Sequence, residues 1–149
     1  MDPNRYRFRS VWLLAAPPDA VFAALERAEE YPRWWRQVRE VVAVDERTGT
    51  GRFRSLLPYD LFVTATETRH DPVGLVLQAA LSGDMEGWAR WTVAGRAGGG
   101  SRVLYEQEVE VRKPLLRRLA VPGRPLFRLN HALMMRSGRR GLAALLEAV

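Results

Sequence analysis

The segment Arg102–Val111 alternates between polar and apolar positions, and this pattern limits the possible fold more than any other feature of the chain. One face of the segment carries Glu106, Glu108 and Glu110. The opposite face carries the residues that point toward an interior: Val103, Tyr105, Gln107, Val109 and Val111. A period of two residues is that of a β-strand with one face in water and the other in a core. The pattern therefore predicts a sheet with one solvated face, which is typical of antiparallel sheets.

Six further segments have the length and residue pattern of strands: Tyr6–Leu14, Val38–Val44, Arg52–Leu57, Leu61–Arg69, Leu75–Leu81 and Glu86–Ala94. The glycines and threonines of Thr48–Gly51 predict a hairpin turn there, and Pro58 interrupts the strand that follows. His70, beside Asp71 and Pro72, is interpreted as a turn residue. Because short turns join all seven segments, we expect one antiparallel sheet.

The segments between and after the predicted strands include stretches in which apolar residues have helical spacing. Two short helices, Ala20–Ala28 and Glu30–Trp35, are predicted after the first strand. A short basic helix is predicted over Leu115–Ala120, and a long helix begins near Pro125 and runs toward Ala148. A rise of 1.5 Å per residue gives the long helix a length of about 36 Å, enough to cross a sheet. The predicted fold is α+β, a curved sheet around a long C-terminal helix, in one domain over residues 1–149.

Composition excludes several classes of protein. Apolar residues make up 47% of the 149 residues and charged residues 27%, which is the usage of a folded domain rather than a disordered chain. The absence of cysteine excludes disulfides, thiolate zinc sites and a Cys nucleophile, and two histidines argue against a His-rich metal site. Without a membrane-length apolar run or a signal-peptide pattern, a cytoplasmic location is expected. No nucleotide-binding or protease motif is found, so neither a cofactor nor a metal is expected.

The positive charge is concentrated near the C-terminus. Nine of the 23 basic residues lie between Arg112 and Arg140, where there is no acidic residue, which leaves 14 basic against 17 acidic residues elsewhere. This segment, including Arg117, Arg118, Arg124 and Arg128, is interpreted either as a solvated surface or as a weak contact for anionic membranes. Nucleic-acid binding is not expected, because Pro122 and Gly123 interrupt the basic residues and no aromatic stacking platform accompanies them.

One stripe of the long helix combines bulky apolar groups, a glycine and a histidine: Phe127, His131, Met134, Gly138, Leu142, Leu145 and Val149. Glycine inside a helix costs about 1 kcal/mol relative to alanine, so Gly138 and Gly141 indicate a close neighbour, either the sheet or a ligand. His131 is interpreted either as a hydrogen-bonded core residue or as a polar group that lines a cavity. Tyr105 and Gln107 face the same interior and need polar partners there.

Several segments resemble those of a known superfamily: Ala16–Phe22, Tyr31–Val38, Gly83–Gly87 with Trp91, Tyr105 with Glu106, and Asn130 with His131. In these segments the chain resembles the SRPBCC superfamily, with its START/Bet v 1-like helix-grip fold, and within it the polyketide cyclase/dehydratase-like branch. The resemblance covers essentially the whole chain. It implies an apolar cavity between the curved sheet and the long helix, which members use for lipids, sterols, hormones or polyketides.

Three functions follow as alternatives from this resemblance. The first is a binding module for a hydrophobic small molecule, lipid-like or polyketide-like. The second is a polyketide cyclase/dehydratase of the aromatase/cyclase type, with His131 and Tyr105 as its candidate acid and base. The third is a membrane-associated lipid or quinone chaperone. Ten residues are the predicted ligand contacts: Trp35, Trp91, Tyr105, Gln107, Phe127, Asn130, His131, Met134, Gly138 and Leu142. A monomer and a homodimer both remain open.

Overall fold

Seven antiparallel strands form one sheet in the computed structural model, which describes residues 4–54, 60–112 and 123–147. The strands are β1 (Arg5–Leu14), β2 (Val38–Ala43), β3 (Thr48–Phe53), β4 (Leu61–Asp71), β5 (Val76–Gly83), β6 (Met85–Gly95) and β7 (Ser101–Val111). Their order across the sheet is β1-β7-β6-β5-β4-β3-β2, so β1 and β2 are the two edges. The predicted basic helix Leu115–Ala120 and the break at Pro58 lie outside the described residues.

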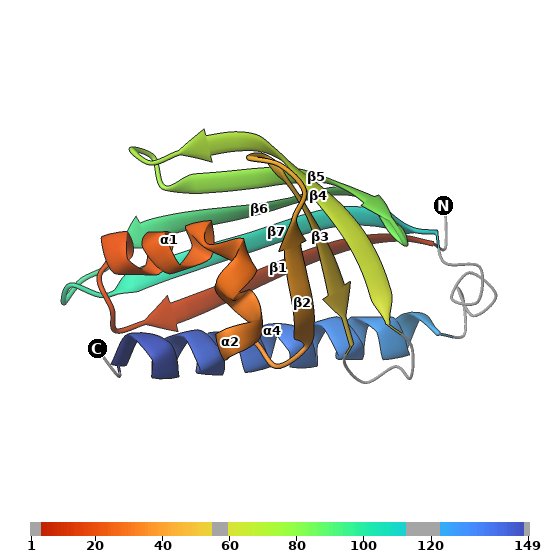
Figure 1. Cartoon of the computed structure of the whole chain (residues 1–149). Coiled ribbons are helices and arrows are strands. Elements are labelled where there is room, and N and C mark those ends of the chain that lie inside the picture. The colour runs from red at the N-terminus through yellow and green to blue at the C-terminus, as the bar shows by residue number, and fades with distance from the viewer. Residues whose placement is uncertain (1–3, 55–59, 113–122, 148–149) are drawn as a thin grey trace.

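The helices lie on the concave side and at one end of this sheet (Figure 1). They are α1 (Pro18–Glu26), the 3-10 turn η1 (Ala28–Glu30), α2 (Tyr31–Trp34) and the long helix α4 (Arg124–Glu147). Proline at the first position and Asp19 in the first turn both favour the start of α1. The sheet curves over α4, and this confirms the predicted helix-grip fold (Figure 1).

The inward face of α4 differs from the predicted stripe at its C-terminal end. Phe127, Gly138 and Leu142 are buried as predicted, and so is Met135, which the stripe did not include. Leu145 is 40% exposed, so its predicted inward position is wrong. Since each residue advances the helix by about 100°, the buried face continues from Leu142 to the next turn at Leu146, which packs against the core. Val149 lies outside the described residues.

The glycines of α4 let α2 approach the helix closely. A Cβ atom on Gly138 would lie 2.6 Å from Trp35 Cε2 and 3.0 Å from Trp12 Cη2. A Cβ atom on Gly141 would collide with the backbone carbonyl oxygen of Trp34. The close neighbour of α4 is therefore α2 and its C-cap residue Trp35, together with Trp12 of β1, rather than a ligand.

The structure corrects two turn predictions. Thr48–Gly51 belongs to β3, and the preceding turn is held by Asp45 Oδ1, which accepts hydrogen bonds of 2.8 Å from the amides of Arg47 and Thr48. Aspartate is common in such turns because its carboxylate accepts hydrogen bonds from the backbone amides that follow it. The predicted turn was based on the glycines and did not take Asp45 into account. His70 lies in β4 rather than in a turn, and its Nε2 is 2.6 Å from Glu26 Oε2 of α1.

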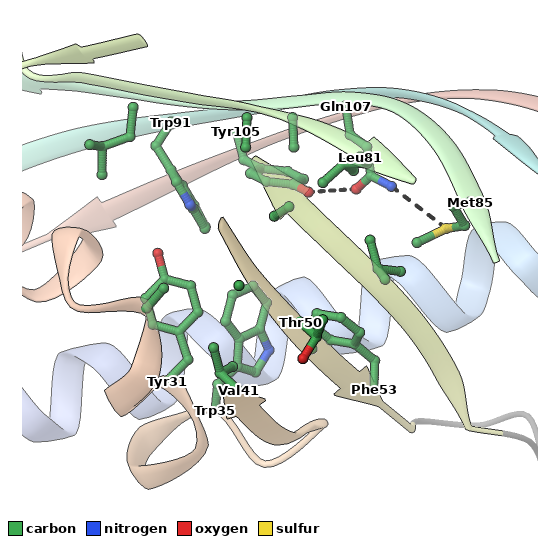
Figure 2. A pocket seen from close by; sticks show the side chains of 18 of the residues that line it. Tyr31, Trp35, Val41, Thr50, Phe53, Leu81, Met85, Trp91, Tyr105 and Gln107 are labelled. Carbon is green, nitrogen blue, oxygen red and sulfur yellow. Dashed lines mark hydrogen bonds between the residues drawn. The ribbon is translucent and has the colours of Figure 1, made fainter. Parts of the chain in front are cut away.

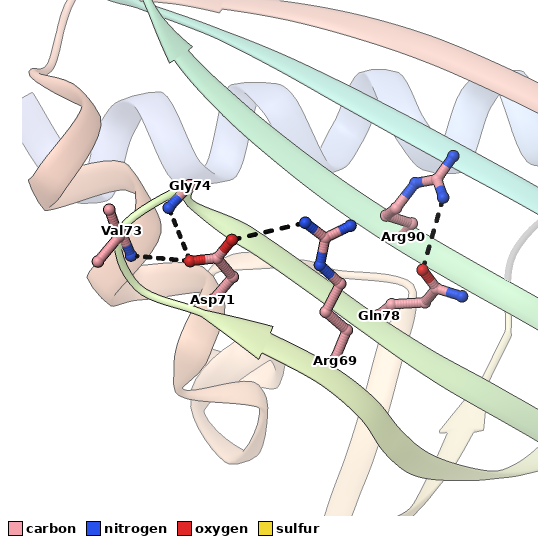
Figure 3. Close-up of polar contacts among 6 residues, drawn as sticks. All are labelled: Arg69, Asp71, Val73, Gly74, Gln78 and Arg90. Carbon is pink, nitrogen blue, oxygen red and sulfur yellow. Dashed lines mark hydrogen bonds and ion pairs between the residues drawn. The ribbon is translucent and has the colours of Figure 1, made fainter.

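The turn between β4 and β5 uses the same chemistry (Figure 3). Asp71 Oδ1 accepts hydrogen bonds from the amides of Val73 and Gly74, at 3.1 and 2.8 Å. These bonds and an ion pair with Arg69 account for the lowered pKa of the Asp71 carboxyl. Farther along the same sheet, the Arg90 guanidinium donates to Gln78 Oε1 on the neighbouring strand β5 at 3.5 Å.

Candidate ligand-binding cavity

A cavity of about 680 Å³ lies between the concave face of the sheet and the helices (Figure 2). Its wall is mainly apolar and aromatic, and includes Phe8, Val63, Leu81, Trp91, Val109 and Phe127. This volume is within the usual range for small-molecule sites, which are lined by apolar side chains with a few placed polar groups. The strand alternation produces this wall, because every second residue of β4 to β7 faces α4.

Aromatic side chains close the end of the cavity near α2. Trp35 packs against Trp91 of the sheet, with ring centroids 6.1 Å apart, and Trp91 packs against Tyr105 at 4.6 Å. Two polar atoms at this end bond to the backbone: Trp35 Nε1 donates to the Met134 carbonyl at 2.8 Å, and the hydroxyl of the neighbouring Tyr31 donates to the Leu25 carbonyl at 2.6 Å. These bonds fix the rings, so their apolar faces are left to line the cavity.

A connected polar group lies on the cavity wall and consists of Tyr105, Gln107 and His131 (Figure 2 shows the first two). The Tyr105 hydroxyl donates to Gln107 Oε1 at 2.5 Å, and His131 Nε2 lies 3.2 Å from the same oxygen. Because an amide oxygen only accepts, His131 Nε2 carries the proton and Nδ1 carries the lone pair. Gln107 Nε2 donates to Met85 Sδ at 4.0 Å, and the Phe8 ring stacks on His131 at 3.8 Å.

The two titratable members of this group are uncharged near neutral pH. Burial lowers the pKa of His131 to about 4, because desolvation disfavours the imidazolium. Burial also raises the pKa of the Tyr105 hydroxyl, for which the anion is the disfavoured form. The wall therefore offers a neutral imidazole and a neutral phenol, which can donate and accept hydrogen bonds but carry no charge.

Eight of the residues that line the cavity are charged and lie at the surface, all exposed except the half-buried Glu30. They are here called the rim: Glu26, Arg27, Glu29, Glu30, Asp45, Glu46, Arg47 and Glu67. They come from the end of α1, from η1, from the β2–β3 turn and from β4. The β2–β3 turn lies at the end of its hairpin that is farther from α4 (Figure 1). The part of the rim that the β2–β3 turn contributes therefore lies away from the basic helix α4.

Eight of the ten predicted ligand contacts line this cavity: Trp35, Trp91, Tyr105, Gln107, Phe127, Asn130, His131 and Met134. Gly138 and Leu142 do not line it; they are buried where α4 packs on the rest of the core. The predicted ligand contacts did not include Tyr6 and Phe8, which also line the cavity; as alternate residues of the predicted strand Tyr6–Leu14, they share one of its faces. Sequence reasoning also missed the whole rim, for which the sequence offered only ordinary surface charges.

Within the ranges that the structure describes, no three potential metal ligands of the His, Asp or Glu type come together. No helix in those ranges is both long enough and apolar enough to cross a membrane. Of the predicted basic surface, Arg117 and Arg118 lie outside the described residues, whereas Arg128 is exposed on α4. Arg124 is half-buried, with its guanidinium 4.5 Å from the Tyr6 ring centroid.

Comparison with known proteins gives a family and a set of similar structures. Residues 14–134 match the model of a family described as polyketide cyclase/dehydrase and lipid transport. The protein TTHA0849 from Thermus thermophilus has a similar structure, with a TM-score of 0.83, 17% identity, and coverage of 96% of this chain and 98% of that one. No curated protein matches the chain by sequence.

Two further solved structures are similar across nearly their whole length. The Zhui aromatase/cyclase from a Streptomyces species has a TM-score of 0.81 at 11% identity, with coverage of 96% of this chain and 94% of that one. A START superfamily protein from Mycobacterium smegmatis has a TM-score of 0.76 at 14% identity, with coverage of 95% and 97%. At these identities the likeness concerns the fold.

Proposed function

The chain belongs to the polyketide cyclase/dehydrase and lipid transport family, and from this premise we propose that it binds a hydrophobic small molecule, lipid-like or polyketide-like, in the cavity. The observation that carries the proposal is the cavity itself, about 680 Å³ with a mainly apolar wall. An apolar ligand gains free energy in proportion to the apolar surface it removes from water. The polar group of Tyr105, Gln107 and His131 supplies the few hydrogen bonds that orient such a ligand.

The test is a variant that fills the cavity. Ala89 of β6 lines the cavity, whereas Ala94 of the same strand is exposed on the other face. We expect Ala89→Trp to weaken binding of a neutral apolar probe such as decanol at least about tenfold, and Ala94→Trp to leave it unchanged. Binding is measured by calorimetry and by the fluorescence of Trp35 and Trp91, which line the cavity. Equal affinity of both variants and the parent would contradict the proposal.

The polar group of the wall favours polyketide cyclisation as the second candidate function. His131 and Tyr105 share one acceptor, Gln107 Oε1, so an imidazole and a phenol lie at one place on the wall. However, a general base works best when its pKa is near the operating pH, and burial lowers that of His131 to about 4. The group is therefore better suited to hydrogen bonding than to proton abstraction, and this supports binding as the first candidate.

Two variants separate these candidate functions. If the protein only binds, His131→Phe and Tyr105→Phe alter affinity modestly, because one hydrogen bond contributes about 0.5 to 1.5 kcal/mol. If it catalyses proton transfer, either variant reduces turnover of a polyketide-like substrate by roughly 10² to 10⁴-fold with a much smaller change in binding. Product analysis by mass spectrometry, beside calorimetry on the same variants, distinguishes the two results.

The negative charge of the rim argues against the third alternative, a membrane-associated lipid or quinone chaperone. A lipid would enter through the rim, where six carboxylates lie beside two arginines. Arg128 of α4, which is exposed and could contact anionic lipid, is not among the residues that line the cavity. An anionic membrane would therefore repel the side of the molecule on which the cavity opens.

A further inference from the structure

The rim carries an excess of negative charge, only part of which is neutralised. Glu30 pairs with Arg27 at 2.8 Å and with Arg33 at 3.1 Å, and Glu26 pairs with His70 at 2.6 Å. Asp45 accepts two backbone amides in its own turn. The remaining three carboxylates, Glu29, Glu46 and Glu67, form no ion pair with any described residue.

One of these unpaired carboxylates continues the apolar wall directly. Val63, Ala65 and Glu67 alternate along β4, and all three line the cavity. Val63 is buried and Glu67 is exposed, so the same face of one strand leads from the interior to the rim. A ligand that lies along β4 with its apolar part at Val63 therefore brings its outer end to the Glu67 carboxylate.

Within the described residues, no arginine lines the inner part of the cavity, although Arg124 and Arg128 of α4 lie near Tyr6 at one end of it. Among the lining residues in the described part of the chain, Arg27 and Arg47 are the only arginines, and both belong to the rim. The titratable groups on the inner wall are His131, Tyr105, Tyr6 and Tyr31, and each of them is neutral near pH 7. Away from Tyr6, a buried carboxylate or phosphate would therefore have no counter-charge on this wall, and an unpaired buried charge is costly.

The inner wall also offers a hydrogen-bond donor that has no acceptor among the described residues. Tyr6 lines the cavity and is 1% exposed, and its hydroxyl is buried with no hydrogen-bond partner among the residues that the structure describes. A buried hydroxyl normally has a partner, so this group points to a ligand that carries an acceptor. The cavity therefore has a neutral polar group within and carboxylates outside.

We propose that the cavity selects its ligand by charge and takes cationic amphiphiles, whose apolar body lies within and whose protonated amine lies at the rim beside Glu29, Glu46 and Glu67. Anionic amphiphiles, such as long-chain carboxylates, are rejected at the same place. This inference rests on the proposed function, since it concerns which hydrophobic molecules enter the same cavity.

The experiment compares three probes that share one apolar body and differ in head group: decylamine, decanol and decanoate at neutral pH. In about 10 mM salt, where exposed charges interact over roughly 30 Å, we expect decylamine to bind at least about tenfold more tightly than decanoate, with decanol between them. In about 1 M salt, where that distance falls to about 3 Å, we expect most of this difference to disappear. Calorimetry below the micelle concentration of each probe measures the affinities.

Variants of the rim assign the effect to its carboxylates. The triple substitution Glu29→Gln, Glu46→Gln and Glu67→Gln should reduce the ratio of amine to carboxylate affinity to about threefold or less, and leave decanol unchanged. The control is Glu147→Gln, at the exposed end of α4, which should keep the parent ratio.

Each outcome of this comparison decides a separate point. If decanol binds but decylamine and decanoate bind equally well, or if the triple variant keeps the parent ratio, the charge selection is overturned and the proposed function stands. If decanol itself does not bind, the proposed function fails, and the charge selection fails with it.

Discussion

At the scale of single residues, the two histidines of the chain experience opposite environments. His131 is desolvated on the cavity wall, which lowers its pKa to about 4 from 6.5. His70 is accessible to solvent, and its hydrogen bond with Glu26, with Glu67 and Asp71 nearby, raises its pKa. The folded state therefore favours the neutral form of one histidine and the charged form of the other.

This difference predicts how stability depends on pH. When the pH falls below 6.5, the unfolded chain protonates His131 before the folded chain does, so stability is lost between pH 6.5 and about 4. The loss is at most about 3 kcal/mol at 1.36 kcal/mol per pH unit. Urea unfolding at a series of pH values measures it, and we expect His131→Phe to flatten the curve in this range.

His70 provides the matched control for that measurement. Its raised pKa contributes stability that is present below pH 6.5 and is lost as the pH rises through the folded-state value. His70→Gln should therefore leave the acid-side loss in place. If His131→Phe keeps the same acid-side slope as the parent, the imidazole is not desolvated in solution.

Tyr6 and Tyr105 both line the cavity, and their hydroxyl groups differ in hydrogen bonding. The Tyr105 hydroxyl donates to Gln107, whereas the Tyr6 hydroxyl is buried without a partner among the described residues. We expect Tyr105→Phe to lower the free energy of unfolding by about 0.5 to 1.5 kcal/mol, and Tyr6→Phe to leave it unchanged or raise it by up to about 1 kcal/mol. Chemical denaturation of the ligand-free protein decides this, and an equal loss in both variants would show that Tyr6 has a partner.

At the scale of elements, the contact of α4 with α2 depends on small residues. Gly141 lies so close to the Trp34 carbonyl that a methyl group cannot be accommodated unless the two helices separate. Alanine favours a helix over glycine by about 1 kcal/mol, whereas overpacking costs typically about 1 to 3 kcal/mol. The collision involves backbone, which cannot rotate away as a side chain can, so the packing effect is the larger one.

We therefore expect Gly141→Ala to destabilise the protein by about 1 to 2 kcal/mol, although alanine is the better helix former. Ala144→Gly, at an exposed position of the same helix, should cost about 1 kcal/mol through helix propensity alone. Thermal unfolding compares the two variants with the parent. A stabilised Gly141→Ala protein would mean that α2 and α4 are farther apart than the structure places them.

The elements themselves were largely predictable from the sequence, and the reasons are local. The alternation of β7 and the helical spacing of α4 each fix which residues face inward, and the resemblance to the SRPBCC superfamily implied the cavity between them. The hairpin turn predicted at Thr48–Gly51 was wrong, because its glycines lie within strand β3 and the turn is formed at Asp45. The charged rim could not be predicted, because Glu29, Glu46 and Glu67 line one cavity only through the packing of η1, the β2–β3 turn and β4.

At the scale of the whole molecule, the cavity is an apolar void that a ligand can fill. A ligand that binds only the folded state stabilises it by RT ln(1 + [L]/Kd), about 2.7 kcal/mol at a hundredfold excess over Kd. We expect decanol to raise the unfolding temperature of the parent and of Ala94→Trp, but not of Ala89→Trp, in which the cavity is filled. Calorimetric scans at increasing decanol concentration measure the shift, and an equal shift in Ala89→Trp would place the binding site elsewhere.

The order of the strands has a consequence for how the chain folds. The strands from β2 to β7 pair in the order in which they follow along the chain, but β1 pairs with β7, so Arg5 lies opposite Glu110. Closing such a long loop costs more chain entropy than closing a hairpin, and pairings of this kind form slowly. β1 brings Tyr6, Phe8 and the connection to α1 into place. We therefore expect the meander from β2 to β7 to assemble before β1 joins its edge, and the complete cavity wall to form only when β1 is in place.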